Sequence, residues 1–343
     1  MAVSLSACQI SYLVKSAYSQ IDLLNRRVPI EKVLQDPSLS EDTRNKLILV
    51  QEARQFAEQN LGLAHTNNYT SFVQLDRPYV TYVVSAANRF QLEPYNWTYP
   101  FLGSLPYKGF FDLEGAKEES TNLIEKGFDT YIRGVTAYST LGWFADPLLS
   151  SMMQYQNYDL VNTIIHETVH ATIYVKSEAD FNEALAAFIG TKGTEAFYLQ
   201  KEGANSQTYM AMKNDAADEV LFAQFMNKEL QALKAWYDDP SQKDLPEAEK
   251  LRAREIKFQT IQEHFRTELA PKLNRKDGYA GFLKGPLNNA LLLTHQLYLN
   301  NFDQFETLFK KLDGNLVRFI QFSKQFEHSK NPQNDMTKAI QSI

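Results

Sequence analysis

The stretch His166-Glu167-Thr168-Val169-His170 places two imidazoles four residues apart, with a carboxylate between them. On a helix, residues i and i+4 share a face, so both rings can reach one metal ion. In a strand the two rings would lie roughly 13 Å apart, too far for one ion. The metal interpretation therefore requires a helix and puts Glu167 beside the ion.

The flanking sequence favours that helix. Residues 160–165 and 171–175 are largely apolar and contain no Gly or Pro. Together with the pentapeptide they predict a buried helix of about four turns, with Asp159 as its N-cap. Two His and a Glu at this spacing are typical of zinc-dependent peptidases. We therefore expect one zinc ion, with His166 and His170 as ligands.

Catalytic zinc takes three protein ligands and leaves one position for water. The third-ligand pattern of metzincins is excluded, because Ile173 and Lys176 occupy its Gly and His positions. The remaining candidates downstream are acidic.

Glu183 lies in residues 181–190, which predict a second helix. A helix that returns antiparallel after a short turn can aim a carboxylate at the His pair. We assign Glu183 as the third metal ligand, with Glu178 as the alternative. Asp180 is a candidate to hydrogen-bond the outer nitrogen of a ligand His, as is usual for metal-bound imidazole.

The dipeptide Asn182-Glu183 resembles the gluzincin peptidases, whose third ligand is the Glu of an Asn-Glu pair on the next helix. The spacer after His170 is shorter here than in thermolysin-like enzymes. Ala187 stands where those enzymes carry an Asp that supports a His. The resemblance implies a gluzincin-like fold and the ligand set His166, His170 and Glu183.

Stretches through most of the chain also resemble the bacterial family of predicted aminopeptidases, lipoproteins that carry HExxH. The most specific is the string Ala-Tyr-Ser-Thr-Leu-Gly-Trp at residues 137–143. Thr168, Val169 and Ala171 depart from the family's usual residues. The resemblance implies a zinc metallopeptidase, and its name an aminopeptidase. The other matching stretches are residues 25–30, 52–57, 75–78, 107–112 and 286–290.

The composition is that of a globular enzyme. Of 343 residues, 44% are hydrophobic and 22% are charged, which is average for a folded protein. The net charge of −6, without a basic stripe, makes nucleic acid an unexpected partner. No apolar stretch reaches eighteen residues, so we expect no membrane-spanning helix.

Cys8 is the one cysteine and follows Leu-Ser-Ala, which matches a bacterial lipobox. The charged and apolar regions of a signal peptide do not precede it, so we expect them to be trimmed or the start codon to be misplaced. We expect Cys8 to carry a lipid anchor, the protein's one link to a membrane. The expected location is the cell envelope, on the periplasmic side.

Along the chain, helices are followed by strands and then by helices, which predicts a mostly helical α+β fold. A small antiparallel sheet, formed by residues 78–84 and 129–136, is expected beside the HExxH helix. We divide the chain into an N-terminal helical segment (8–64), a region with the sheet and metal helices (65–200) and a C-terminal helical region (201–343). The N-terminal helices are expected at 8–25, 30–34 and 42–61.

The expected reaction is hydrolysis of a peptide bond, with a peptide as the substrate. Zinc would activate a water, and Glu167 would take its proton and pass it to the leaving amine. Donors for the oxyanion are left open among His295, Tyr298 and the Asn288-Asn289 pair. Asn288-Asn289 could instead cap a helix. Residues 137–143 are expected to form a sheet edge for an extended peptide.

Two other functions stay open. The chain could be a zinc-binding envelope lipoprotein without turnover, which serves as a scaffold or peptide-binding module. It could also be a helical protein whose motif is a coincidence. The intact Glu167 argues against the first, and metal analysis separates the second.

Overall fold

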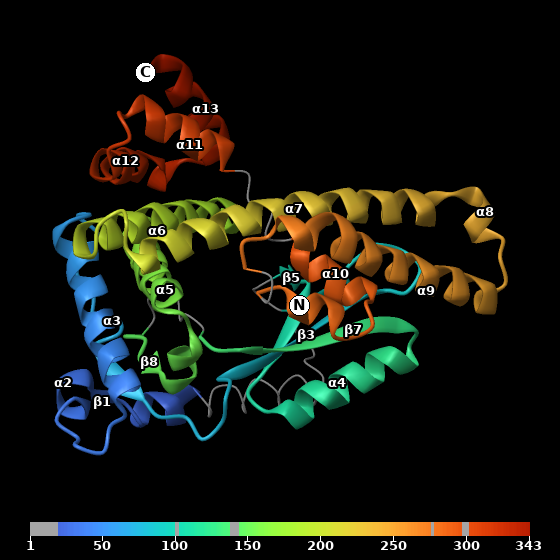
Figure 1. Ribbon diagram of the computed structural model, residues 1–343, viewed down its shortest axis with the longest axis horizontal. Helices are drawn as coiled ribbons and strands as arrows, with labels where there is room; N and C mark the ends of the chain where they lie inside the picture. Colours follow the sequence, from blue (N-terminus) through green and yellow to red (C-terminus); the bar gives the residue numbers. More distant parts are fainter. Residues whose placement is uncertain (1–19, 100–102, 138–143, 276–277, 297–301) are drawn as a thin grey trace, which may run out of the picture. The chain divides into compact units, whose positions relative to one another are not determined.

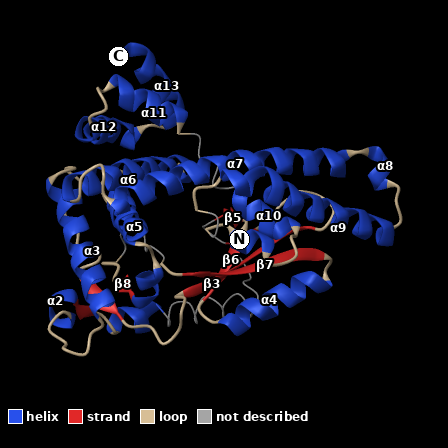
Figure 2. Cartoon of the chain, viewed as in Figure 1, coloured by secondary structure: helices blue, strands red, loops and turns tan. Residues whose placement is uncertain are grey.

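The computed structural model describes residues 20–99, 103–137, 144–275, 278–296 and 302–343 (Figure 1). Three predictions fall on residues outside these ranges. They are the lipid anchor at Cys8, the candidate oxyanion donor Tyr298, and most of the expected sheet edge, residues 138–143. The described part is mostly helical with small sheets, in agreement with the α+β expectation (Figure 2). None of the described helices has the length and apolarity to cross a membrane.

The chain forms two compact units, each built from segments that are distant in sequence. Unit 1 comprises Met1–Val80, Thr136–Tyr209 and Asn300–Ile343. Unit 2 comprises Thr81–Val135 and Met210–Leu299. The metal helices predicted from the sequence belong to unit 1, and the predicted sheet belongs to unit 2.

Unit 1 is built around three helices that pack on one another, α3 (Glu41–Gln59), α5 (Asn157–His170) and α6 (Ala179–Lys201). Ser40 caps the first of them by accepting the N–H of Thr43, and Gly62, with a φ of +70°, follows its end. The elements before the metal helices are β1 (Val28–Pro29), α2 (Ile30–Val33), α3 (Glu41–Gln59), β2 (Ser71–Val73), β8 (Leu148–Leu149) and a 3-10 turn (Ser150–Gln154). Strands β1, β2 and β8 form one small mixed sheet, with β2 in the middle.

The HExxH segment is helical, as the metal interpretation requires. Helix α5 (Asn157–His170) begins two residues before the predicted N-cap, so Asp159 lies in its first turn. The expected extension over residues 171–175 is wrong, since α5 ends at His170. The chain leaves the helix there because the buried Asn182 amide binds both the N–H and the C=O of Val175, at 2.9 and 2.8 Å.

Helix α6 (Ala179–Lys201) returns alongside α5 and is longer than the predicted 181–190. The C-terminal helices of unit 1 pack on it through aromatic side chains. Phe188 on α6 stacks on Phe305 and contacts Phe319, with ring centroids 5.7 and 5.1 Å apart. These helices are α11 (Asp303–Lys311), α12 (Leu316–Ser323) and α13 (Pro332–Ser342).

Unit 2 contains the predicted antiparallel sheet, in the order β6-β3-β7. Alternate residues of β3, such as Tyr82, Val84 and Ala86, pack in the cluster that α4 covers. Helix α10 packs on the same sheet, and Figure 1 shows it on the side opposite α4. The elements are β3 (Thr81–Asn88), β4 (Trp97–Tyr99), β5 (Gly103–Leu105), β6 (Tyr107–Phe110), α4 (Leu113–Glu125), β7 (Phe128–Val135) and α10 (Asn289–Gln296).

A long helix and its return complete unit 2. Helix α7 (Gln207–Asp238) is followed by α8 (Pro240–Lys243) and α9 (Glu247–His264), which runs back along α7 (Figure 1). Pro240 and the residues before it break the helical run. Short π and 3-10 turns follow between Phe265 and Leu283. Together these elements bury the second core of the unit, which includes Phe225, Leu230, Phe258, Phe265 and Phe282.

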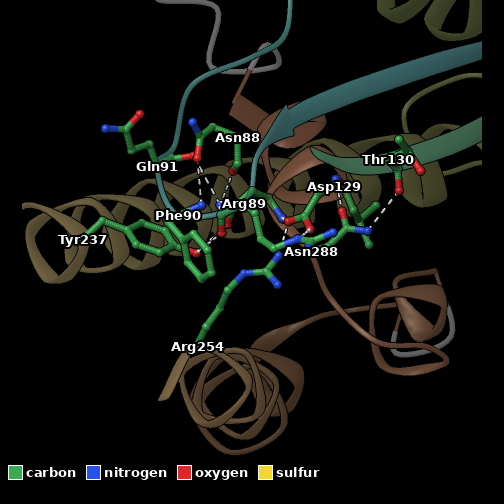
Figure 3. A network of polar contacts seen from close by, with 11 residues as sticks. Asn88, Arg89, Phe90, Gln91, Asp129, Thr130, Tyr237, Arg254 and Asn288 are labelled. Carbon is green, nitrogen blue, oxygen red and sulfur yellow. Dashed lines mark hydrogen bonds and ion pairs between the residues drawn. The ribbon is translucent and has the colours of Figure 1, made fainter. Parts of the chain in front are cut away.

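A buried polar network joins the start of α10 to the sheet (Figure 3). Asn289 is fully buried; its backbone N–H donates to Asp129 at 2.9 Å, and its amide donates to the carbonyl of Asn88 at 2.9 Å. Arg254 of α9 pairs with the same Asp129 carboxylate, and the Tyr237 hydroxyl donates to Asn289. The Asn288-Asn289 pair therefore has a structural role, in which it holds α10 on the sheet of unit 2.

Candidate metal centre

The two histidines of α5 lie one turn apart and face the same way. Their ring centroids are 4.8 Å apart and the rings are nearly perpendicular, at 82°. The two Nε2 atoms are 3.1 Å from each other. The His170 side chain is 7% exposed and the His166 side chain is 20% exposed, so the His166 ring lies nearer to solvent.

Glu183 brings its carboxylate to both rings from α6. One oxygen lies 3.5 Å from Nε2 of His166, and the other lies 3.4 Å from Nε2 of His170. Two donors that each lie about 2 Å from a tetrahedral ion are about 3.3 Å apart. The two imidazole nitrogens are close to this spacing, whereas the two Glu183 distances belong to different oxygens. One donor atom from each of the three side chains lies within 4.8 Å of the others, so the side chains converge on one place. The two-His, one-carboxylate donor set is one that catalytic zinc accepts.

The charges of this triad are coupled. Hydrogen bonds from His166 and His170 hold the pKa of Glu183 well below its usual range. Burial alone would lower the pKa of His170, but the hydrogen bond and charge of Glu183, together with the charge of Glu167, raise it. The arrangement thus places a carboxylate against two imidazoles. A bound cation could balance its charge in place of a proton on the imidazoles.

Two buried atoms beside the triad have no hydrogen-bond partner in the described part of the chain. They are Oε2 of Glu167 and Nδ1 of His170. Buried polar atoms are almost always paired, so each marks a place where a further group is expected. The unpaired oxygen of Glu167 has a lone pair available to a water molecule, as a proton acceptor requires.

Close packing of α5 on α6 positions His166. A Cβ added at Gly190 of α6 would meet Oδ1 of Asn162 at 3.2 Å and Cβ of His166 at 3.3 Å. Gly190 is buried in the middle of α6, where glycine weakens a helix by about 1 kcal/mol relative to Ala. The missing side chain lets the two metal helices approach closely.

The other candidates from the sequence lie elsewhere. Glu178 is the residue before α6, and it is not among the three side chains that converge. Asp180 forms no hydrogen bond to either ligand His within the described residues. Asn288 accepts the N–H of Leu291, which agrees with the helix-capping interpretation.

Three residues near the site were not singled out for these roles by sequence reasoning. Asn182 holds the loop between the metal helices, and Gly190 sets their distance. Tyr69 is buried with a φ of +57°, and burial followed by the charge of Glu167 raises the pKa of its phenol. Tyr69 is therefore a neutral hydroxyl in the surroundings of Glu167. A glycine inside a helical pattern was the one available signal; nothing in the sequence marks Tyr69.

The family comparison agrees with the resemblance seen in the sequence. Residues 11–337 match the family model described as "Putative aminopeptidase". The chain belongs to this family. The match covers nearly the whole chain, including both units and the residues of the triad. No curated protein and no solved structure matches it. Membership in the aminopeptidase family indicates a peptidase.

Proposed function

We propose that this member of the aminopeptidase family is a zinc-dependent peptidase with a gluzincin-like centre. The observation that carries the proposal is the convergence of His166, His170 and Glu183 at separations of 3.1, 3.4 and 3.5 Å. These side chains would hold one zinc ion, which when bound would supply Lewis acidity to a water and to the peptide carbonyl. Family membership supports the choice of a peptide as the substrate.

Glu167 is the proposed general base. It follows His166 on α5, so its carboxylate comes from the same turn as a ligand, and its Oε2 is buried without a partner in the described residues. In this proposal the water oxygen forms a bond to the carbonyl carbon while Glu167 takes the water's proton. The carbon–nitrogen bond then breaks, and Glu167 returns that proton to the leaving amine. The net change is peptide plus water to acid plus amine.

Tyr69 is the proposed hydroxyl donor of the centre. Its phenol is held neutral by burial and lies in unit 1 with the triad. A neutral O–H aimed at developing negative charge is the kind of group that stabilises an oxyanion. His295, Asn288 and Asn289 belong to unit 2, where the two asparagines hold structural hydrogen bonds.

The substitution Glu167→Gln tests the base. The variant should bind one zinc per chain like the unaltered protein, while hydrolysis of unblocked peptides falls by at least about a thousandfold. Zinc is measured by elemental analysis of protein purified without added metal, and hydrolysis by product chromatography. Equal cleavage by both proteins would remove Glu167 from the mechanism. Zinc binding without cleavage by the unaltered protein would favour the scaffold function.

Two further variants separate the candidates for the third ligand. Glu183→Gln should lower zinc occupancy, and the matched variant Glu178→Gln should not, because only Glu183 contacts both imidazoles. Aminopeptidase action is tested with a length series of unblocked and N-acetylated peptides. Release of single N-terminal residues from unblocked peptides alone supports it, whereas cleavage of the acetylated series shows an endopeptidase.

A further inference from the structure

Unit 2 contains a cavity that the metal centre does not use. Its volume is about 510 Å³, which is within the usual range for small-ligand pockets. It lies between residues 278–286, helix α7, strand β7 and the length of α10. The lining residues are Tyr131, Phe222, Gly278, Tyr279, Gly281, Phe282, Lys284, Gly285, Pro286, Asn288, Leu291 and His295.

The walls of the cavity are aromatic. Phe222 and Tyr279 are stacked, with centroids 4.7 Å apart and an angle of 27° between the rings. Phe282 and His295 meet Phe222 edge-on, at 5.8 and 5.2 Å. Such rings present flat faces and edges, which favour another flat ring by stacking and edge-to-face contact.

Two polar groups of the lining are free to bind a ligand. The ring nitrogens of His295 have no hydrogen-bond partner among the described residues. Burial lowers the pKa of the His295 imidazole and so favours its neutral form. A neutral imidazole offers one donor and one acceptor. The Tyr279 phenol stays protonated as well, since burial raises its pKa to about 12.

The lining residues carry one positive charge and no negative charge. Lys284 lines the cavity, is exposed to solvent, and forms no ion pair with the described residues. Three acids, Glu219, Asp218 and Asp215, act on Tyr279 by their charge. Arg275 and Asn274 engage Asp218, and Arg275 also pairs with Asp215. None of the three lines the cavity. An anionic group at the mouth of the cavity would therefore meet an unpaired ammonium.

We infer that this cavity binds a small molecule in which a flat aromatic ring is joined to a carboxylate. The ring would lie against Phe222 and Tyr279, with His295 at its edge, and the carboxylate would reach Lys284. The inference does not depend on the zinc centre, whose donor residues are all in unit 1.

The test uses the full chain with a chelator present and phenylpropionate as the probe, followed by isothermal titration calorimetry. We expect saturable binding with a Kd on the order of 100 μM, as ligand efficiency allows for a probe of this size. Cyclohexylpropionate, which lacks the flat ring, and phenylpropanol, which lacks the carboxylate, should each bind at least about fivefold more weakly.

Two variants locate the binding. Lys284→Ala should weaken phenylpropionate about tenfold, while the matched surface variant Lys272→Ala should change it less than about twofold. Leu291→Phe should fill part of the cavity and abolish binding, with the circular dichroism melt as a check of folding. Absence of saturable binding up to about 5 mM would overturn the inference. Equal weakening by Lys284→Ala and Lys272→Ala, or equal affinity for phenylpropanol, would do so as well.

Discussion

At Asn182, one buried amide joins the loop after α5 to the first turn of α6. Its two hydrogen bonds go to the N–H and the C=O of the buried Val175. The C=O also accepts the N–H of Glu178 at 3.3 Å, so the N–H is the group that depends on Asn182. The next residue is Glu183, so the position of the third donor depends on how firmly this loop is held. A single side chain outside the donor set thus sets the geometry of the triad.

Asn182→Ala should therefore reduce both stability and zinc affinity. We expect a loss of about 1–2 kcal/mol in the free energy of unfolding, because the buried N–H of Val175 loses its partner and the C=O keeps the one from Glu178. Zinc affinity should fall about tenfold, the effect typical of a group that orients a ligand. Urea unfolding and competition with a chelating dye measure the two quantities. Asn60→Ala, at an exposed asparagine of unit 1, is the control; an Asn182 variant with unchanged affinity would contradict the positioning role.

Asp218 is a buried acid of unit 2 with three donors. It accepts the N–H groups of Asn274 and Arg275 and the amide of Asn274, at 2.8–2.9 Å. Burial alone would raise its pKa, but these hydrogen bonds outweigh it and lower the pKa. A pKa that is lower in the folded state means stability that is present above the unfolded value and is lost as pH falls through the folded value.

Asp218→Asn should accordingly cost stability at neutral pH and little in acid. We expect a loss of about 1–2 kcal/mol at pH 7. The difference from the unaltered protein should begin to shrink below about pH 4, where Asp218 of the unfolded chain takes up a proton, and should disappear once the pH falls through the lower pKa of the folded state. Urea unfolding across this range gives the curve, and Asp76→Asn at an exposed site serves as the control. A difference that stays constant with pH would show that the charge of Asp218 is not involved.

At the scale of elements, the candidate metal centre depends on how closely α5 and α6 approach. Gly190 and Gly193 both lie on the face of α6 that meets α5. A Cβ at Gly193 would touch the ends of the Ile165 and Leu61 side chains, at 3.0–3.2 Å. A Cβ at Gly190 would press on the Cβ of His166, an atom that cannot move without the helix backbone. The two glycines therefore have different roles.

Gly190→Ala and Gly193→Ala should separate packing from metal binding. We expect Gly190→Ala to lower zinc affinity about tenfold, because His166 must shift relative to Glu183. For Gly193→Ala we expect affinity within about threefold and a stability change of about 1 kcal/mol or less, since the gain in helix propensity offsets the crowding. Zinc titration and thermal unfolding of both variants provide the comparison. The same loss of affinity in both would argue against a specific contact at Gly190.

At the scale of the whole molecule, all three proposed metal donors belong to one unit. A ligand that binds the folded state alone stabilises it, by about 4 kcal/mol when its free concentration is a thousandfold above Kd. Zinc should therefore stabilise unit 1, and unit 2 should respond only as far as the two unfold together.

Chelation should show this directly. Treatment with EDTA is expected to raise amide hydrogen exchange in α5 and α6 of unit 1, and to leave β3 and β7 of unit 2 nearly unchanged. Exchange followed by peptide mass spectrometry resolves the two regions, and the Glu183→Gln variant should show no response to EDTA. An unchanged exchange pattern in α5 and α6 would speak against a metal at this centre.

Local features of the chain were predictable because they depend on neighbours in sequence. The i, i+4 spacing of His166 and His170 determines that they share a helix face. Ser40 caps the start of α3 and Gly62 follows its end, and both ends of the helix lie within two residues of the prediction. The end of α5 was not predictable in this way, because the apolar run after His170 has no stop signal and Asn182 captures Val175 from the next helix.

By itself, the amino-acid sequence determined the residue types of the proposed metal centre, the helix that carries the two histidines, and the alternation of apolar residues that makes the sheet. Tertiary structure alone decided that residues 300–343 join unit 1 while 210–299 join unit 2, that Tyr69 lies in the surroundings of Glu167, and that a glycine lets His166 approach α6. The reason is physical. Periodicity and capping act over a few residues along the chain, whereas packing joins surfaces whose sequence separation leaves no trace in local pattern.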